Sequence, residues 1–150
     1  MIVAIDGDGV VIDLHPEWCA RYNRDWNDVL EPEQITDWDI TKFVKPECGK
    51  RIFDYLHDED LYLYTQPVPN ATWGVEQLKR VARVVFVTSC VDGAADQKRR
   101  WLERHHFLAQ SPGGSSSDYI VANDKGLIKA DILIDDYHKN LEAFSGYGLL

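Results

Sequence analysis

Two short apolar runs, one near each end of the chain, are each followed directly by aspartates. Ile2-Val3-Ala4-Ile5 leads into Asp6-Gly7-Asp8, and Ile132-Leu133-Ile134 leads into Asp135-Asp136. Apolar runs of this length are typical of buried parallel strands. Because ligands of an open parallel sheet bind outside the carboxyl ends of its strands, both acidic pairs are expected at one edge. Clustered carboxylates repel unless a cation joins them, so the pattern predicts a hard divalent metal such as Mg²⁺.

The composition narrows the class of protein. A chain of 150 residues is expected to form one domain, and its net charge of −9 argues against a nucleic-acid partner. Its three cysteines form no C-x-x-C pair, which favours a reducing cytoplasm over a disulfide framework or a zinc site. The sequence predicts no signal peptide and no membrane span.

Further apolar runs alternate with helical patterns along the chain. Strands are predicted at residues 2–6, 83–88, 119–122 and 132–134, with the start of a fifth at 146–150. This alternation predicts an α/β fold, a Rossmann-like parallel sheet flanked by helices. The Ser- and Gly-rich residues 111–117 are expected to form a mobile surface loop.

The segment between the first two strands is largely helical and too long for a simple crossover. Helices are predicted from His15 and from Pro46, and Asn70 is expected to be the N-cap of the next helix. We therefore predict a small helical cap inserted after the first strand, standing over the carboxyl edge of the sheet. The predicted boundaries are 1–14 and 71–150 for the core and 15–70 for the cap.

The turn after the first strand, Asp6-Gly7-Asp8-Gly9-Val10, carries the strongest chemical signal. One carboxylate can act as a nucleophile toward phosphorus, and a second, two residues later, can handle protons at the same site. The alternatives are an acidic turn that caps a helix and a calcium loop. A calcium loop needs an oxygen ligand at its fifth position, where this chain has Val10.

Three other polar positions follow predicted strands. The hydroxyl of Thr88, with Ser89 beside it, could bond a phosphate oxygen, although such residues also cap helices. The ammonium of Lys125 could neutralise a transferring phosphoryl group, unless it is a solvated surface lysine; Lys129 is its nearby competitor. One residue of Asp135-Asp136 is expected to bind metal directly, and one could serve as a helix N-cap.

Together these four motifs resemble the haloacid-dehalogenase superfamily of phosphotransferases. Asp6-x-Asp8-Gly9-Val10 resembles the first motif of the superfamily. Thr88, Lys125 and Asp135-Asp136 resemble its second, third and fourth motifs and follow in the same order. The second aspartate of the first motif is what the superfamily's phosphatases carry and its dehalogenases lack. The resemblance therefore implies phosphoryl transfer.

Within that superfamily the chain is similar to the 5′(3′)-deoxyribonucleotidase family, also called 5′-nucleotidase C type. The similarity covers the opening motif through Asp13, a cap segment Ile35-Thr-Asp-Trp-Asp-Ile40, Pro67-Val-Pro-Asn-Ala71, and the closing block through Asp136. Two residues depart from the family pattern. Asn70 replaces a glycine, and Leu14 stands where a phenylalanine beside the base is common.

The resemblance implies a mechanism. Mg²⁺ would be held by Asp6, by the main-chain carbonyl of Asp8, and by Asp135 or Asp136. Asp6 would form an aspartyl-phosphate, while Asp8, kept protonated by its carboxylate neighbours, would donate to the leaving sugar oxygen. Thr88 and Lys125 would hold the phosphate oxygens, with Ser89 nearby.

The cap would select the substrate. Trp38, Tyr62, Leu14 and Leu56 are candidates to enclose a nucleobase, and the alternative for Trp38 and Tyr62 is packing within the cap itself.

The sequence therefore predicts a cytoplasmic Mg²⁺-dependent phosphatase of nucleoside monophosphates, with deoxyribonucleotides favoured. The alternatives are a phosphatase for another small phosphoester such as a sugar phosphate, an idle phosphate- or metal-binding module, and a phosphatase of nucleic-acid ends. The net charge of −9 disfavours the last of these. The sequence does not decide between a monomer and a homodimer.

Overall fold

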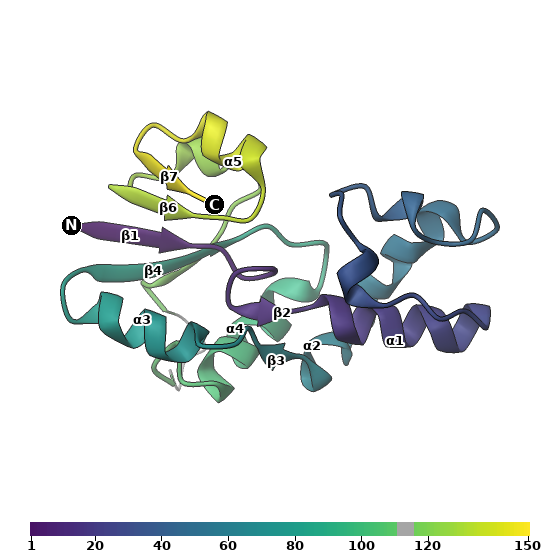
Figure 1. Cartoon of the computed structure of the whole chain (residues 1–150). Coiled ribbons are helices and arrows are strands. Elements are labelled where there is room, and N and C mark those ends of the chain that lie inside the picture. Colours follow the sequence, from purple (N-terminus) through teal and green to yellow (C-terminus); the bar gives the residue numbers. More distant parts are fainter. Residues whose placement is uncertain (111–115) are drawn as a thin grey trace.

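A five-stranded parallel sheet forms the centre of the molecule in the computed structural model, which describes residues 1–110 and 116–150 (Figure 1). The strands lie in the order β5-β4-β1-β6-β7, so the first strand of the chain occupies the middle. Their bounds are Ile2–Ile5 for β1, Arg83–Thr88 for β4, Tyr119–Val121 for β5, Ile132–Ile134 for β6 and Tyr147–Leu149 for β7. The predicted α/β sheet, including its fifth strand, is confirmed.

The central strands are buried on both faces, which explains why their sequences are apolar without alternation. Val3 and Ile5 of β1 face one hydrophobic cluster, whereas Ala4 between them faces a second. The first cluster is the larger and includes Trp101 of the helix α4, Ala94–Arg104. The second includes Phe144, which follows the helix α5, His138–Ala143. The central strand β1 thus contributes to both layers of the core.

Helices follow the strands as the alternation predicted. Their bounds are Ala71–Lys79 for α3, Ala94–Arg104 for α4 and His138–Ala143 for α5. The N-cap of α3 is Asn70, as predicted, but its side chain makes no capping hydrogen bond. Asn70 instead has a left-handed backbone with φ of 67°, a conformation that asparagine tolerates better than most residues and that glycine adopts freely. The shared requirement for positive φ accounts for asparagine at a family glycine position.

An insertion between β1 and α3 contains short helices and a two-stranded sheet (Figure 1). Its elements are β2 at Ile12–Asp13, α1 at His15–Trp26, the 3-10 helices η1 at Pro32–Gln34, η2 at Ile40–Lys42 and η3 at Gly49–His57, α2 at Leu61–Tyr64, and β3 at Gln66–Pro67. The antiparallel pairing of β2 with β3 brings the two ends of the insertion together.

One predicted helix of the insertion differs from the observed one. The helix expected to open at Pro46 begins at Gly49 and is a 3-10 helix. Its neighbour α1 begins at His15 as predicted, and the buried Arg21 of α1 pairs with Asp58 and Asp60 beyond η3. These charge pairs help to hold α1 beside the residues that follow η3.

Two further observations concern the sequence predictions. Residues 111–115, which make up most of the predicted loop at 111–117, lie outside the described residues. In the part of the chain that the structure describes, no helix combines the length and the apolar character needed to cross a bilayer.

The buried Trp101 on α4 gives a test of the core. Its ring stacks on Phe107 with centroids 5.6 Å apart, and its Nε1–H donates to the main-chain oxygen of Thr65 at 3.1 Å. Trp101→Ala is expected to lower the free energy of unfolding by roughly 3–5 kcal/mol because it leaves a large cavity. Urea denaturation measures the change. The matched variant Trp73→Ala removes an indole that is 66% exposed and should change stability by less than roughly 0.5 kcal/mol. Equal losses in the two variants would contradict this assignment of the core.

Candidate active site

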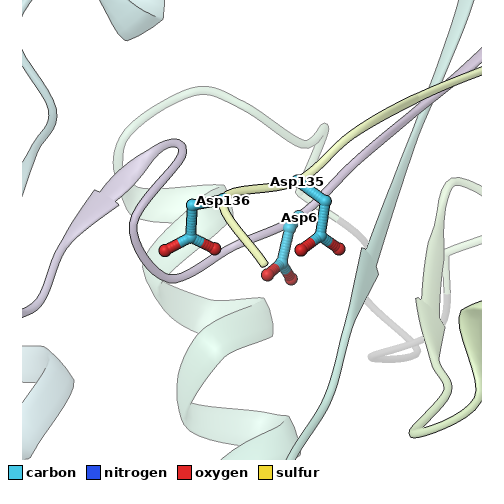
Figure 2. A group of neighbouring side chains, drawn as sticks. All are labelled: Asp6, Asp135 and Asp136. Carbon is cyan, nitrogen blue, oxygen red and sulfur yellow. The ribbon is translucent and has the colours of Figure 1, made fainter. Parts of the chain in front are cut away.

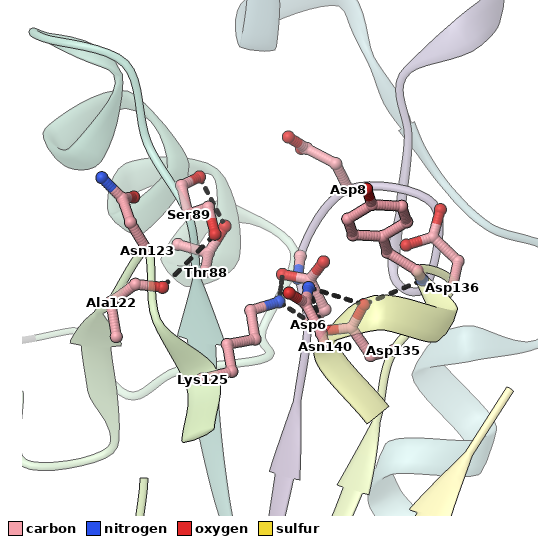
Figure 3. Close-up of polar contacts among 12 residues, drawn as sticks. Asp6, Asp8, Thr88, Ser89, Ala122, Asn123, Lys125, Asp135, Asp136 and Asn140 are labelled. Carbon is pink, nitrogen blue, oxygen red and sulfur yellow. Dashed lines mark hydrogen bonds and ion pairs between the residues drawn. The ribbon is translucent and has the colours of Figure 1, made fainter. Parts of the chain in front are cut away.

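The four sequence motifs meet at the carboxyl edge of the sheet (Figure 3). Asp6 follows β1 and Thr88 ends β4, while Asp135 follows β6; β1 pairs with both of the other strands. Lys125 opens the short 3-10 helix η4 at Lys125–Leu127 and reaches the same edge. The parallel register thus places residues that are far apart in sequence side by side.

Three carboxylates form a cluster at this edge, which we call the acidic triad: Asp6, Asp135 and Asp136 (Figure 2). One oxygen of each lies within 4.8 Å of the others. Lys125 is 1% exposed and joins two of them, with Nζ 2.7 Å from Oδ1 of Asp6 and 2.6 Å from Oδ2 of Asp135. Lys129, the competing lysine, is exposed. Lys125 is therefore the lysine that can act in this site.

The electrostatics of the acidic triad favour binding of a cation. Burial raises the pKa of Asp6 to about 6, although Lys125 acts in the opposite direction. Burial, together with the charges of Asp6 and Asp135, raises the pKa of Asp136 to about 7. The Oδ1 atom of Asp136 is buried and has no hydrogen-bond partner among the described residues. A set of carboxylate oxygens with an unpaired buried member fits a hard cation such as Mg²⁺.

Asp135 and Asp136 differ in their hydrogen bonding. Oδ1 of Asp135 accepts from the main-chain N–H of Tyr137 at 2.9 Å, and both oxygens accept from Nδ2 of Asn140, at 3.1 and 3.0 Å. Asp135 is thus fully engaged within the protein, whereas Asp136 keeps a free oxygen. Asn140, which lies on α5, was missed by the sequence analysis because a single asparagine inside a helix carries no distinctive signal.

The turn that carries Asp6 and Asp8 packs closely against Asp136. The main-chain oxygen of Gly7 accepts from the amides of Val11 and Ile12, both at 2.9 Å, which closes the turn. Gly9 has φ of +76°, and a Cβ placed there would lie 2.0 Å from Oδ2 of Asp136. Glycine is therefore required at position 9 both for its backbone conformation and for the space that Asp136 occupies.

The environment of Asp8 differs from the one expected. Its Oδ2 lies 2.8 Å from Nζ of Lys98 and accepts a hydrogen bond from the hydroxyl of Tyr62 at 3.1 Å. An ammonium group and a hydroxyl, and not the predicted carboxylates, therefore bond this oxygen. Burial alone would lower the pKa of Lys98, but the negative charge of the neighbouring Asp8 raises this pKa above its ordinary value.

Lys98 was also missed by the sequence analysis. It lies on α4 among charged residues, where a lysine is ordinarily exposed, yet it is 3% exposed. Its Nζ donates to Oγ1 of Thr88 at 3.0 Å and to the main-chain oxygen of Ser89 at 2.6 Å. The hydroxyl of Ser89 donates to the main-chain oxygen of Ala122 at 3.3 Å (Figure 3). Thr88 therefore faces Lys98, and Ser89 is tied to the end of β5.

A cavity of about 640 Å³ opens beside the acidic triad. Asp8, Gly9 and Asp136 line it together with apolar side chains of the insertion, which include Leu14, Trp38 and Leu56. The indole Nε1–H of Trp38 donates to the main-chain oxygen of Asp136 at 3.2 Å, so Trp38 spans from the insertion to the core. The polar part of this cavity could hold a phosphate group, and its apolar part could hold a flat organic group.

Tyr62 was predicted either to enclose a nucleobase or to pack within the cap, and the structure places it in the buried hydrophobic cluster. It is 3% exposed, is not among the cavity-lining residues and contacts Asp8 through its hydroxyl. Burial and the neighbouring Asp8 raise the pKa of Tyr62, so its hydroxyl keeps its proton and acts as a donor.

Gly9→Ala tests the contact between the turn and the acidic triad. The added methyl group must displace Asp136, so the variant should lose most of any increase in unfolding temperature that Mg²⁺ gives the parent. Gly93→Ala is the matched control, because Gly93 has φ of +85° but open space around it. Both variants bear the strain of positive φ, roughly 1–2 kcal/mol. Thermal unfolding with and without Mg²⁺ measures the difference, and an undiminished Mg²⁺ response in Gly9→Ala would contradict the contact.

Comparison with solved structures identifies the fold. A haloacid dehalogenase-like hydrolase from Burkholderia xenovorans matches with a TM-score of 0.53 and 14% identity, over 95% of this chain and 74% of that one. A haloacid dehalogenase-like family protein from Streptococcus pneumoniae matches with a TM-score of 0.54 and 11% identity, over 95% and 78%. At such low identity these similarities concern the fold alone.

Comparison of the sequence gives a narrower result. The chain is 35% identical over 149 residues to the 5′(3′)-deoxyribonucleotidase of Clostridium acetobutylicum, covering 99% of this chain and 79% of that protein. It is 29% identical over 151 residues to the enzyme of the same name from Bacillus subtilis, covering 99% and 83%. Residues 1–150 match the family described as 5′ nucleotidase, deoxy (Pyrimidine), cytosolic type C protein. The chain belongs to this family of 5′-nucleotidases, which is built here on a haloacid dehalogenase-like fold.

Proposed function

We propose that the protein is a Mg²⁺-dependent phosphomonoesterase that releases phosphate from deoxyribonucleoside monophosphates, as the names of its relatives indicate. The observation that carries the proposal is that the acidic triad, held together by Lys125, lies beside a cavity that Asp8 and Asp136 line and whose remaining wall is largely apolar. Such a cavity suits a substrate with a phosphate at one end and a base at the other.

The acidic triad offers the ligands for the metal. Asp6 and Asp136 would hold it through their carboxylates, with the main-chain carbonyl of Asp8 as a third ligand, since Asp136 has an unpaired oxygen. Asp135 is bonded to Lys125 and Asn140 and would orient the group from behind. When bound, Mg²⁺ neutralises negative charge on the phosphate.

The chain's own residues account for two half-reactions. A carboxylate oxygen of Asp6 attacks phosphorus, the bond to the ester oxygen breaks, and Asp8 gives its proton to that oxygen. Water then attacks the phosphorus of the aspartyl-phosphate and transfers a proton to Asp8, which releases phosphate and restores Asp6. Asp8 is the acid of the first step and the base of the second.

Lys125 and Thr88 would hold the phosphate oxygens during both steps. Lys125 already contacts Asp6, so its ammonium lies beside the attacking oxygen and can stabilise the negative charge on the oxygens of the transferring phosphoryl group. Lys98, which bonds Thr88, adds a second buried cation close to the same edge. The hydroxyl of Ser89 donates to the main-chain oxygen of Ala122. Ser89 would therefore contribute to the site through its place in the chain next to Thr88.

Selection of the base falls to the apolar wall of the cavity. Trp38 and Leu14 would enclose the base, with Leu56 beside them. Tyr62 would act on Asp8 and not on the base, given its hydrogen bond. The predicted division into a core of residues 1–14 and 71–150 and a cap of residues 15–70 remains a proposal, in which the cap supplies Trp38 and Leu56 for the base and Tyr62 for Asp8.

Three other sequence-based expectations remain proposals. The family description names a cytosolic type, which agrees with a cytoplasmic location. The net charge of −9 favours a free nucleotide over a nucleic-acid end as substrate. A homodimer stays a prediction that solution scattering can test.

The alternative substrate is another small phosphoester, such as a sugar phosphate. It would use the polar end of the cavity but would leave the wall formed by Leu14, Trp38 and Leu56 without a partner. A module that only binds phosphate or metal, without catalysis, would not need an aspartate such as Asp8, whose carboxylate is held by Lys98 and Tyr62. Initial rates on deoxynucleotides and sugar phosphates, measured side by side, separate these functions.

Asp6→Asn tests the nucleophile. We expect Mg²⁺-dependent hydrolysis of a deoxyribonucleoside monophosphate to fall by on the order of a thousand-fold or more, because an amide oxygen is a poor nucleophile. Phosphate release measures the loss, and circular dichroism checks that the fold survives. Glu76→Gln, the same chemical change at an exposed position on α3, should keep the parent rate. If Asp6→Asn turned over as fast as the parent, the nucleophile assignment would be wrong.

The pKa values of the acidic triad predict how metal binding depends on pH. The pKa values of Asp6 and Asp136, about 6 and about 7, lie above the ordinary 3.8, so the metal-free fold gains stability from these groups below pH 4 and loses it as pH rises to 7. Mg²⁺ must displace these protons at low pH. We expect Mg²⁺ to raise the unfolding temperature more at pH 8 than at pH 5. An equal increase at both pH values, measured by calorimetry, would argue against binding by these carboxylates.

A further inference from the structure

The two carboxylate oxygens of Asp8 have different surroundings. Oδ2 is bonded twice, by the ammonium of Lys98 at 2.8 Å and by the hydroxyl of Tyr62 at 3.1 Å. Oδ1 is buried and has no hydrogen-bond partner in the described part of the chain. Asp8 also lines the cavity proposed for the substrate. The carboxylate is therefore anchored through Oδ2, which fixes the orientation of Asp8 at the wall of the cavity.

Both anchoring side chains are themselves held in place. Lys98 lies on α4 and also donates to Thr88 and to the main chain of Ser89, at 3.0 and 2.6 Å. Tyr62 lies on α2 of the insertion, and its main-chain oxygen accepts from Nη2 of Arg104, also on α4, at 2.8 Å. The Lys98 ammonium lies 5.6 Å from the centre of the Tyr62 ring. One helix of the core thus fixes Lys98, Tyr62 and, through them, Asp8.

We propose that Tyr62 and Lys98 are positioning residues that clamp Oδ2 of Asp8 and so hold its carboxyl group in the orientation in which it gives the proton to the leaving sugar oxygen. This inference rests on the proposed function. It adds that the insertion supplies, through Tyr62, a group that acts on the proton-transfer step as well as residues that enclose the base. Neither side chain needs to touch the substrate for this role.

The rate of bond cleavage depends more strongly on proton donation when the leaving group is poorer. A nucleoside alkoxide needs a proton as its bond to phosphorus breaks, whereas p-nitrophenolate is stable without one. A residue that only packs the insertion against the core would influence both substrates alike. The ratio of the two rates therefore separates positioning of Asp8 from a general structural role.

The experiment compares the parent with Tyr62→Phe in single-turnover assays with Mg²⁺, using a deoxyribonucleoside monophosphate and p-nitrophenyl phosphate. Release of the first product is followed, so the later hydrolysis of the phosphoenzyme does not contribute. We expect nucleoside release to slow by on the order of ten-fold, the usual effect of losing one hydrogen bond to a charged group. Nitrophenolate release and nucleotide affinity should change by less than about two-fold, because the phosphate contacts are intact.

The matched control is Tyr64→Phe, which removes the same hydroxyl group two residues later on α2. Tyr64 is 58% exposed and belongs to neither the cavity nor the site, so both rates should equal those of the parent. Unchanged nucleoside release in Tyr62→Phe would overturn the inference and leave the proposed function standing. Equal slowing of both substrates in a folded Tyr62→Phe protein would also overturn it. A parent that fails to hydrolyse nucleotides would overturn the proposed function and the inference together.

Lys98→Met provides a second variant if Tyr62→Phe does not fold, as judged by thermal unfolding. It removes the other bond to Oδ2 and also the bond to Thr88, so both rates should fall and the nucleotide rate should fall further. Lys98→Arg, which keeps the positive charge, should recover part of the rate. Failure of Lys98→Met to discriminate between the two substrates would overturn the clamp.

Discussion

The buried ammonium of Lys125 is the interaction on which the catalytic edge depends. Three carboxylates with oxygens within 4.8 Å of one another would repel strongly in a buried site, and Lys125 offsets part of that repulsion by pairing with Asp6 and Asp135. The remaining imbalance appears in the raised pKa values of Asp6 and Asp136. One cation supplied by the chain and one supplied by solvent would together balance the site, so metal binding and stability of this edge are linked.

Lys98, the second buried cation, has a different role from Lys125. Lys98 pairs with Asp8, the proposed acid and base, which is not a member of the acidic triad. The two lysines thus pair with different aspartates, Lys125 with Asp6 and Asp135 and Lys98 with Asp8. This separation lets two aspartates only two residues apart take different roles, because each faces its own partners.

The sequence was sufficient to predict the sheet, its strands and the meeting of the four motifs, because apolar runs and parallel pairing are determined by local pattern and topology. The choice of Lys125 over Lys129 is supported by burial of the former, which the sequence could not reveal. Lys98 and Asn140 were missed since each is a common residue in an ordinary helical context and acquires its role only through tertiary contacts. The position of Tyr62 shows the same limit: its aromatic character suggested the base, but its hydroxyl lies against Asp8.

The short ladder between β2 and β3 has a consequence for how such a protein can vary. Pairing of Ile12 with Pro67 and of Asp13 with Gln66 brings the entry and exit of a segment of more than fifty residues to one point above the sheet. Closing a longer loop costs little more than closing a shorter one, by about 0.6 kcal/mol for each doubling of length. The segment could therefore be lengthened, shortened or exchanged for another while the parallel strands keep their spacing, so recognition of the substrate can change without a change in the sheet.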